Sequence, residues 1–190
     1  MNYPNKKKKT TSKDHYSNLG VTLESDIEIT NEYYLQNNIA VIHKKPTPIQ
    51  VVDVSYPSRN KAKITKAFYR KPSTTDFNGI YKGYYIDFDA KETTSKTSMP
   101  FANIHKHQMN HLKSVKEHGG IAFLIVAWKA YDEYYLITLE DLWPLWEVSL
   151  NGGRKSIPYS YFKEKGHMIK FSYVPRLDYL KVIDKLITLL

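Results

Sequence analysis

Apolar residues recur at helical spacing in four segments of the chain. Leu23, Ile27, Thr30 and Tyr34 follow one another three or four positions apart, and residues at that spacing share one face of a helix. Acidic residues lie in the first turn of this segment, where the helix dipole favours them. The same periodicity recurs further along. We predict helices at residues 22–38, 103–118, 139–148 and 177–190.

Shorter apolar stretches, bounded by Pro, Gly or Asn, predict strands. Pro46 and Pro48 separate the first two of them, because proline restricts its own backbone and that of the preceding residue. The stretch 121–128 is almost continuously apolar, as in a strand covered on both faces. A turn through Asn78 and Gly79 is expected to lead into the strand at 84–90. The remaining strands are predicted at 40–43, 49–56, 61–69, 73–77 and 134–138.

These elements predict an α/β fold with a mixed central β-sheet flanked by helices. Residues 46–70 form an exposed ribbon beside it, a protruding β stalk. With 190 residues and 42% hydrophobic residues, the chain suits a single domain over residues 21–190. Residues 1–20 are rich in lysine and poor in apolar groups, so we predict a flexible basic arm there.

The composition excludes several classes of protein. Cysteine is absent, which removes disulfides, thiolate nucleophiles and cysteine-ligated metals. No apolar run is long enough to cross a bilayer, and the basic start is not followed by the apolar stretch of a secretory signal. We therefore expect no membrane association and a cytoplasmic location.

Positive charge is concentrated in one segment. The net charge is +9, and residues 43–71 hold eight Lys or Arg against Asp53 alone. Aromatic residues are interleaved with these bases, a pattern typical of nucleic-acid binding. A merely solubilising surface, or a lysine-rich genome bias, remains the alternative. The predicted DNA-binding residues are Lys44, Lys45, Arg59, Lys61, Lys63, Lys66, Phe68, Tyr69, Arg70 and Lys71.

The strand at 84–90 carries the candidate chemistry. Alternation along a strand turns Tyr85, Asp87, Asp89 and Lys91 to one face and Ile86, Phe88 and Ala90 to the core. Adjacent carboxylates repel unless a cation or a partner compensates their charge. Asp76 lies 13 residues before Asp89, close enough to reach the neighbouring strand. We expect three carboxylates and a lysine to converge.

Oxygen ligands of this kind suit Mg²⁺, with Mn²⁺ as an alternative. Such a cation can activate a bound water and offset charge that develops on a phosphate, while lysine orients that water or stabilises the transition state. An Asp-x-Lys triplet by itself is a weak motif, and it is more often part of an exposed charged strand with ordinary cross-strand pairing. Gln108 adds support, because it is a polar residue in the middle of the apolar stripe of its helix; a core glutamine bonded to the backbone is the alternative.

Longer strings make the pattern specific. An aspartate followed 13 residues later by Asp-x-Lys resembles the PD-(D/E)xK nuclease superfamily, whose fold is restriction-endonuclease-like. From residue 1 to about residue 180 the chain resembles the RecU family of Holliday junction resolvases. Five stretches of sequence carry the resemblance, and they occur in the order expected for the family. They are NEYYLQNNIAVIHKKPTPIQ, STTDFNGIYKGYYIDFDAKET, HKHQ, NGGRKSI and YVPRLDY.

The resemblance implies a role for each matching residue. Thr74, Asp76, Asp89 and Gln108 would ligate magnesium, and Lys91 would stabilise the transition state. Asp89 stands where the family usually has glutamate, which puts the geometry and the rate in doubt rather than the chemistry. Asp87 is added from the strand pattern as an accessory acid.

The resemblance also implies an activity and partners. The chain would be an endodeoxyribonuclease that resolves four-way DNA junctions by paired symmetric cuts during recombination and repair. It would act as a homodimer whose stalk enters the junction, with a recombinase or a branch migration helicase as candidate protein partners.

Three alternatives stay open. A DNA-binding recombination module without cleavage would keep the basic surface but not need the acids. A sequence-specific restriction-like nuclease would share the site. His107 and His111 are spaced as zinc ligands on a helix, but the glutamate of the metalloprotease motif is missing.

Overall fold

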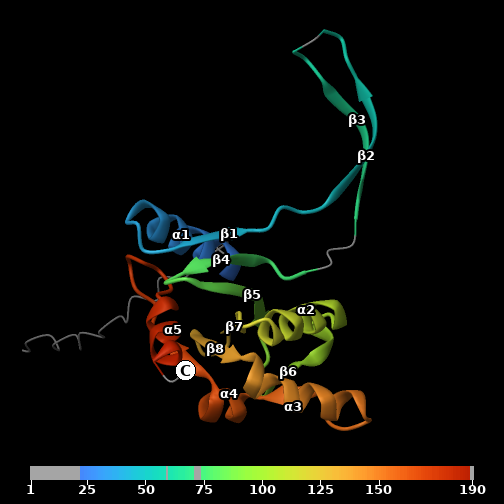
Figure 1. Ribbon diagram of the computed structural model, residues 1–190. Coiled ribbons are helices and arrows are strands. Elements are labelled where there is room, and N and C mark those ends of the chain that lie inside the picture. Colours follow the sequence, from blue (N-terminus) through green and yellow to red (C-terminus); the bar gives the residue numbers. More distant parts are fainter. Residues whose placement is uncertain (1–21, 59, 71–73, 189–190) are drawn as a thin grey trace, which may run out of the picture.

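A six-stranded mixed sheet forms the centre of the computed structural model, which describes residues 22–58, 60–70 and 74–188 (Figure 1). The strand order is β1-β4-β5-β7-β8-β10. Only β5 and β7 pair in parallel; the other neighbours are antiparallel. The strands are β1 (Val41–Lys44), β4 (Phe77–Tyr81), β5 (Tyr84–Thr93), β7 (Ile121–Trp128), β8 (Glu133–Thr138) and β10 (His167–Ile169).

Helices cover both faces of this sheet. On one face, α1 and α5 bury Leu23, Ile27 and Ile183 against inward residues of β5 and β7. On the other face, α2, α3 and α4 form a second core. The predicted mixed sheet between helices is thus confirmed. The helices are α1 (Leu23–Gln36), the short 3₁₀ helix η1 (Phe101–Asn103), α2 (Lys106–Glu117), α3 (Leu139–Leu150), α4 (Tyr159–Lys165) and α5 (Leu180–Ile187).

The alternation predicted on the central strands is present. Phe88 of β5 stacks between Phe77 and Phe123, with ring centroids 5.0 Å and 4.7 Å apart. Along β7, alternate residues enter the two cores, so every residue of this strand is buried. The strand that carries the candidate chemistry therefore has an apolar face anchored in the first core.

A two-stranded ribbon projects from the sheet, as expected for residues 46–70 (Figure 1). It consists of β2 (Ile49–Ser55) and β3 (Lys63–Tyr69), which pair antiparallel with two register irregularities. All of the side chains of β3 are exposed. Bulges of this kind increase the twist of a strand pair and blunt its exposed edges.

The expected turn at Asn78 and Gly79 is wrong. These residues lie inside β4, and the chain reverses at Lys82 and Gly83, both with positive φ. Gly79 is required for packing, because a Cβ there would lie 2.1 Å from the carbonyl oxygen of Val41 on β1. A two-residue turn with both φ values positive matches the twist of an antiparallel pair.

Some short elements were not predicted. A second ribbon of β6 (Ser98–Pro100) and β9 (Ser156–Pro158), together with α4 and β10, follows no period long enough to detect. The predicted arm at residues 1–20 lies outside the described residues. Within the described part of the chain, no helix combines the length and apolar character needed to cross a membrane.

Candidate active site

The polar face of β5 turns toward α2, as the strand alternation predicts. Asp87 and Asp89 are both fully buried there. The hydroxyl of Tyr85 donates to Asp87 at 2.9 Å, and the ammonium of Lys91 contacts Asp89. The four residues therefore form two adjacent pairs along one side of the strand.

Asp76 reaches Asp89 from the residue just before the neighbouring strand, β4. It directly precedes β4, whose register pairs Phe77 with Phe88, so the next position along faces Asp89. Burial raises the pKa of Asp89 to about 7; the charge of Lys91 acts to lower it, and the charge of Asp76 raises it. Asp76, Asp89 and Lys91 are thus brought together as expected, at a point where negative charge is poorly compensated.

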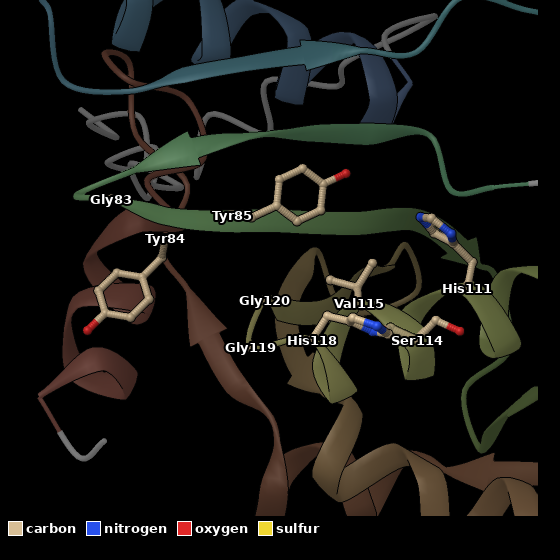
Figure 2. A pocket seen from close by; sticks show the side chains of 9 residues that line it. All are labelled: Gly83, Tyr84, Tyr85, His111, Ser114, Val115, His118, Gly119 and Gly120. Carbon is tan, nitrogen blue, oxygen red and sulfur yellow. The ribbon is translucent and has the colours of Figure 1, made fainter.

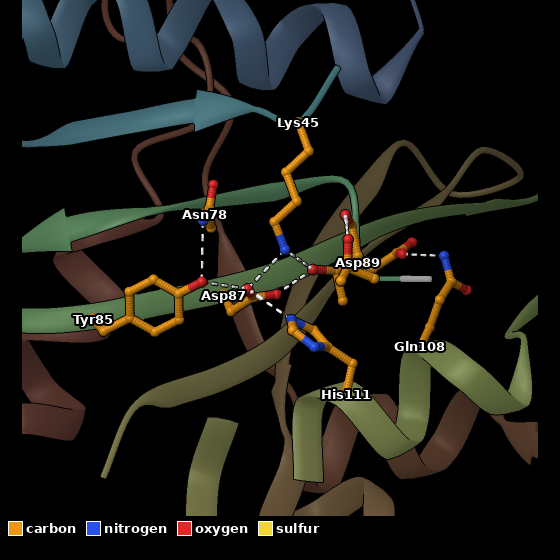
Figure 3. Close-up of polar contacts among 9 residues, drawn as sticks. Lys45, Asn78, Tyr85, Asp87, Asp89, Gln108 and His111 are labelled. Carbon is orange, nitrogen blue, oxygen red and sulfur yellow. Dashed lines mark hydrogen bonds and ion pairs between the residues drawn. The ribbon is translucent and has the colours of Figure 1, made fainter. Parts of the chain in front are cut away.

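Gln108 joins this group from α2 (Figure 3). Its side-chain carbonyl accepts a hydrogen bond from the backbone N–H of His105 at 3.1 Å, which caps the first turn of the helix. Its amide nitrogen donates to Asp89. The backbone contact considered for a core glutamine is therefore present, but so is the contact with the acid.

Asp87 belongs to a separate network. It accepts hydrogen bonds from Lys45 at 2.8 Å, from Tyr85, and from the hydroxyl of Thr75, and His111 lies 3.0 Å away (Figure 3). The expected convergence of three carboxylates is therefore wrong. Among the described residues, no three histidine, cysteine or acidic side chains gather closely enough to hold a metal ion, and this also gives no support to the zinc alternative.

The two threonines before β4 differ in placement. Thr74 is half-buried, and its hydroxyl bonds only weakly to the carbonyl of Thr75, at 3.5 Å. Thr75 is buried; its hydroxyl donates a hydrogen bond to Asp87 and accepts one from Lys45. Sequence reasoning missed Thr75 and the partnership of His111 with Asp87, because neither position breaks a local pattern.

The predicted DNA-binding residues fall into two groups. Lys44 contacts Glu28 and Glu24 of α1 at 2.6 Å and 2.9 Å, and Lys45 points inward to Asp87. On the ribbon, Lys66 lies over the ring of Phe68 at 5.6 Å and Arg70 donates to Gln50 at 3.3 Å. Lys61, Lys63 and Tyr69 are exposed on the ribbon, whereas Arg59 and Lys71 lie outside the described residues.

A pocket opens beside Tyr85, at the start of the polar face of β5 (Figure 2). Its volume is about 540 Å³, and its walls come from the β4–β5 turn, the start of β5 and the C-terminal half of α2. His111 lines it from one side and His118 from another. Two partners of Asp87, Tyr85 and His111, therefore line this pocket, while Asp87 itself is buried behind them.

Comparison with known proteins gives a consistent assignment. The family model described as "Recombination protein U" matches residues 18–185. A protein of Oceanobacillus iheyensis named Holliday junction resolvase RecU is 50% identical, over 98% of this chain and 99% of the relative. One of Staphylococcus carnosus with the same name is 50% identical, over 98% of this chain and 96% of the relative.

Among solved structures, the Holliday junction resolvase Hjc of Archaeoglobus fulgidus covers 76% of this chain and is itself covered to 92%, with a TM-score of 0.43 and 9% identity. The family assignment rests on the family model and the two close relatives.

Proposed function

The chain belongs to the RecU family, and from that premise we propose that it resolves four-way DNA junctions as a structure-selective endonuclease in recombination and repair. The observation that carries the proposal is the meeting of Asp76, Asp89, Lys91 and Gln108 on one side of β5, at the base of an exposed basic ribbon. A junction would be bound by the ribbon and cut at the acids.

The residues present fit a divalent metal ion, Mg²⁺ in our proposal and Mn²⁺ as the alternative. Asp76 and Asp89 would hold it, with the oxygen of Thr74 as a further donor. Gln108 would join them once its amide turns, because its nitrogen faces Asp89 and its oxygen accepts from His105. All of these are hard oxygen ligands. The buried Asp89 carboxyl, with its raised pKa and a second carboxylate beside it, is the observation that favours an added positive charge. When bound, the ion would activate water and neutralise charge on the phosphate.

The chain's own residues supply the rest of the chemistry. Lys91 would place a positive charge next to the scissile phosphate, where it stabilises the charge that develops as the bond to the leaving oxygen breaks. Its side chain is only 14% exposed, so it acts from a largely water-excluded position. Asp89 takes the role that glutamate has in the family, from a shorter side chain.

The basic ribbon would read the shape of the junction. Lys63 and Lys66 lie on β3, and Lys61 just precedes it. β3 projects away from β5, the strand of Asp89 (Figure 1). Phosphate contacts from such residues give affinity without sequence preference. Exposed Phe68 and Tyr69 offer surfaces on which unpaired bases can stack.

A homodimer would place two equivalent sites on symmetric strands. Exposed apolar residues support this part of the proposal: on a ribbon with a single layer, exposed Ile49 faces exposed Tyr69, and exposed Ile64 faces the partly buried Val54. Light scattering at micromolar concentration should show twice the mass of the chain, and a stable monomer would argue against dimerisation. A cytoplasmic location belongs to the same proposal, because the substrate is DNA; a recombinase or branch migration helicase is its candidate protein partner.

The deciding experiment is cleavage of a four-way junction and of linear duplex, each with Mg²⁺ and with a chelator. Cutting of the junction alone, and only with metal, is the expected result. Binding without cutting would favour a DNA-binding recombination module. Cutting of linear duplex at one sequence would favour a restriction-like nuclease.

A further inference from the structure

Lys45 lies where the chain leaves the sheet for the ribbon. β1 ends at Lys44, and the ribbon begins directly after Lys45. The backbone N–H of Lys45 donates to the carbonyl of Asp76 at 2.7 Å. Its ammonium donates to Thr75 and to Asp87, each at 2.8 Å. One residue at the outgoing root of the ribbon therefore holds the returning root and the strand of the active site.

Asp87 is the other end of this link. The carboxylate is fully buried, and its partners come from both roots of the ribbon, from β5 and from α2 (Figure 3). A buried charge with this many partners tolerates little movement, because any lost contact leaves it unpaired in a poorly hydrated interior. The network therefore fixes the ribbon roots relative to β5.

The same contacts limit what Asp87 and Lys45 can do. A carboxylate has about four lone-pair sites, and four side chains already surround this one. The side chain of Lys45 is only 18% exposed, with its ammonium turned to Asp87. A direct role in metal binding for Asp87, or in phosphate contact for Lys45, would require these bonds to break.

We propose that Lys45 and Asp87 are positioning residues that transmit the placement of the ribbon to Asp76 and Asp89. This inference rests on the proposed function. A junction that engages the ribbon sets the orientation of its roots, and Lys45 carries that orientation to the carbonyl of Asp76 and, through Asp87, to the strand of Asp89. The link sets the rate of cutting, whereas the ribbon sets the affinity.

The test compares Lys45→Met with a matched control, Lys116→Met. Lys116 lies on α2, the helix of Gln108 and His111, but its ion pair is with Glu140 on the surface. Three quantities are measured: the Kd for a four-way junction in chelator, the single-turnover cleavage rate at saturating protein with Mg²⁺, and the unfolding temperature. The control should match the parent in all three.

For Lys45→Met we expect the rate to fall by about tenfold or more, since small misplacements of reacting groups cost up to about a hundredfold. The Kd in chelator should stay within about threefold of the parent. A weaker Kd with a lower salt dependence and an unchanged rate would make Lys45 a phosphate contact and overturn the inference. A folded Lys45→Met variant with the Kd and the cleavage rate of the parent would also overturn the inference. A parent that fails to cut junctions would instead overturn the proposed function.

Two further variants keep the test decisive if Lys45→Met does not fold. Asp87→Asn keeps the shape of the carboxyl group but releases Lys45, and should reduce the rate in the same way. Tyr85→Phe removes one hydroxyl from the network at a residue that is 40% exposed, and should reduce the rate by a smaller factor with an unchanged Kd. Parent-like rates in both folded variants would contradict the link.

A separate experiment tests whether the effect of Lys45 on the cleavage rate depends on the ribbon. Shortening residues 57–67 to a tight turn removes the distal part of the ribbon and leaves Lys45 in place. If the link transmits the placement of the ribbon, Lys45→Met should lower the rate by a smaller factor in the shortened protein than in the full chain, because coupled changes are not additive. Equal factors in the two backgrounds would show that Lys45 acts independently of the ribbon.

Discussion

Gln108 donates its side-chain amide to Asp89, so the first turn of α2 is joined to β5 through a fully buried carboxylate. The two residues are 19 positions apart. The same carboxylate contacts Lys91 through its other oxygen. Asp89 thus lies at the centre of the site, and the charge of its carboxyl group affects the stability of the protein.

Asp89→Asn should stabilise the metal-free protein at pH 8 more than at pH 5. Burial raises the pKa of the folded carboxyl from its usual 3.8 to about 7, so the folded protein keeps a proton that the unfolded chain releases. The contribution of this carboxyl group to the free energy of unfolding is fully present below about pH 3.8 and is lost as the pH rises through 7. Asparagine does not titrate, so the variant lacks this pH dependence of stability. The gain at pH 8 is at most ~4 kcal/mol.

Thermal unfolding of the parent and Asp89→Asn in chelator, from pH 5 to pH 8, checks this prediction. A difference in unfolding temperature that does not change with pH would contradict it.

Asp76→Asn should keep junction binding and lose cutting. The change removes a negative charge from the proposed metal site and leaves the ribbon intact, so the cleavage rate should fall by at least about a hundredfold. Gel-shift titration in chelator and a single-turnover assay measure the two effects. A cleavage rate within tenfold of the parent would exclude Asp76 from the site.

Lys91→Ala should also lose cutting, because the positive charge beside the phosphate is removed. We expect a rate loss of about a hundredfold with the fold retained, since the lysine is on the polar face of β5. Circular dichroism confirms folding, and Lys129→Ala, which removes a half-exposed partner of Glu92, is the matched control. Retained activity in folded Lys91→Ala would show that its charge is dispensable.

Replacing Lys61, Lys63 and Lys66 together by Gln should weaken junction binding and flatten its salt dependence. Each lost phosphate contact lowers the slope of log K against log salt by about 0.9 on duplex. The rate at saturating protein should fall by a smaller factor than the affinity, because β3 projects away from the strand that carries the acids and acts on them through the roots of the ribbon (Figure 1). An unchanged slope would move the phosphate contacts to the basic loop at residues 151–155 or to the N-terminal arm.

Gly79→Ala should destabilise the protein, because the new methyl group would collide with the backbone of β1 at Val41 and Ile42. Overpacking costs typically ~1–3 kcal/mol, and backbone atoms have little room to move aside. Gly83→Asn is the control: its φ is +83°, nothing lies within 4 Å of a Cβ there, and Asn tolerates this conformation. Urea unfolding that ranks the two variants equally would contradict the packing argument.

Local patterns in the chain were enough to predict the main elements. The first helix begins after Thr22, whose hydroxyl accepts from Ser25, and β7 spans the predicted residues 121–128. Alternation on β5 placed Asp89 and Lys91 together on the polar face, since a strand turns alternate residues to opposite sides whatever surrounds it. The position of Asp76 beside Asp89 was predictable from the 13 residues that separate them along the chain.

Contacts between distant segments were decided only by the tertiary structure. The sequence placed Lys45 with the DNA-binding bases, but its ammonium is held inside by Asp87 and Thr75. An Asn-Gly pair is typical of hairpins and predicts a turn at Gly79. The structure instead pairs Gly79 with Ile42 of β1, and the close approach of β1 explains why glycine is needed there. Periodicity reports which face of an element is buried, whereas the partner that covers it depends on how the elements pack.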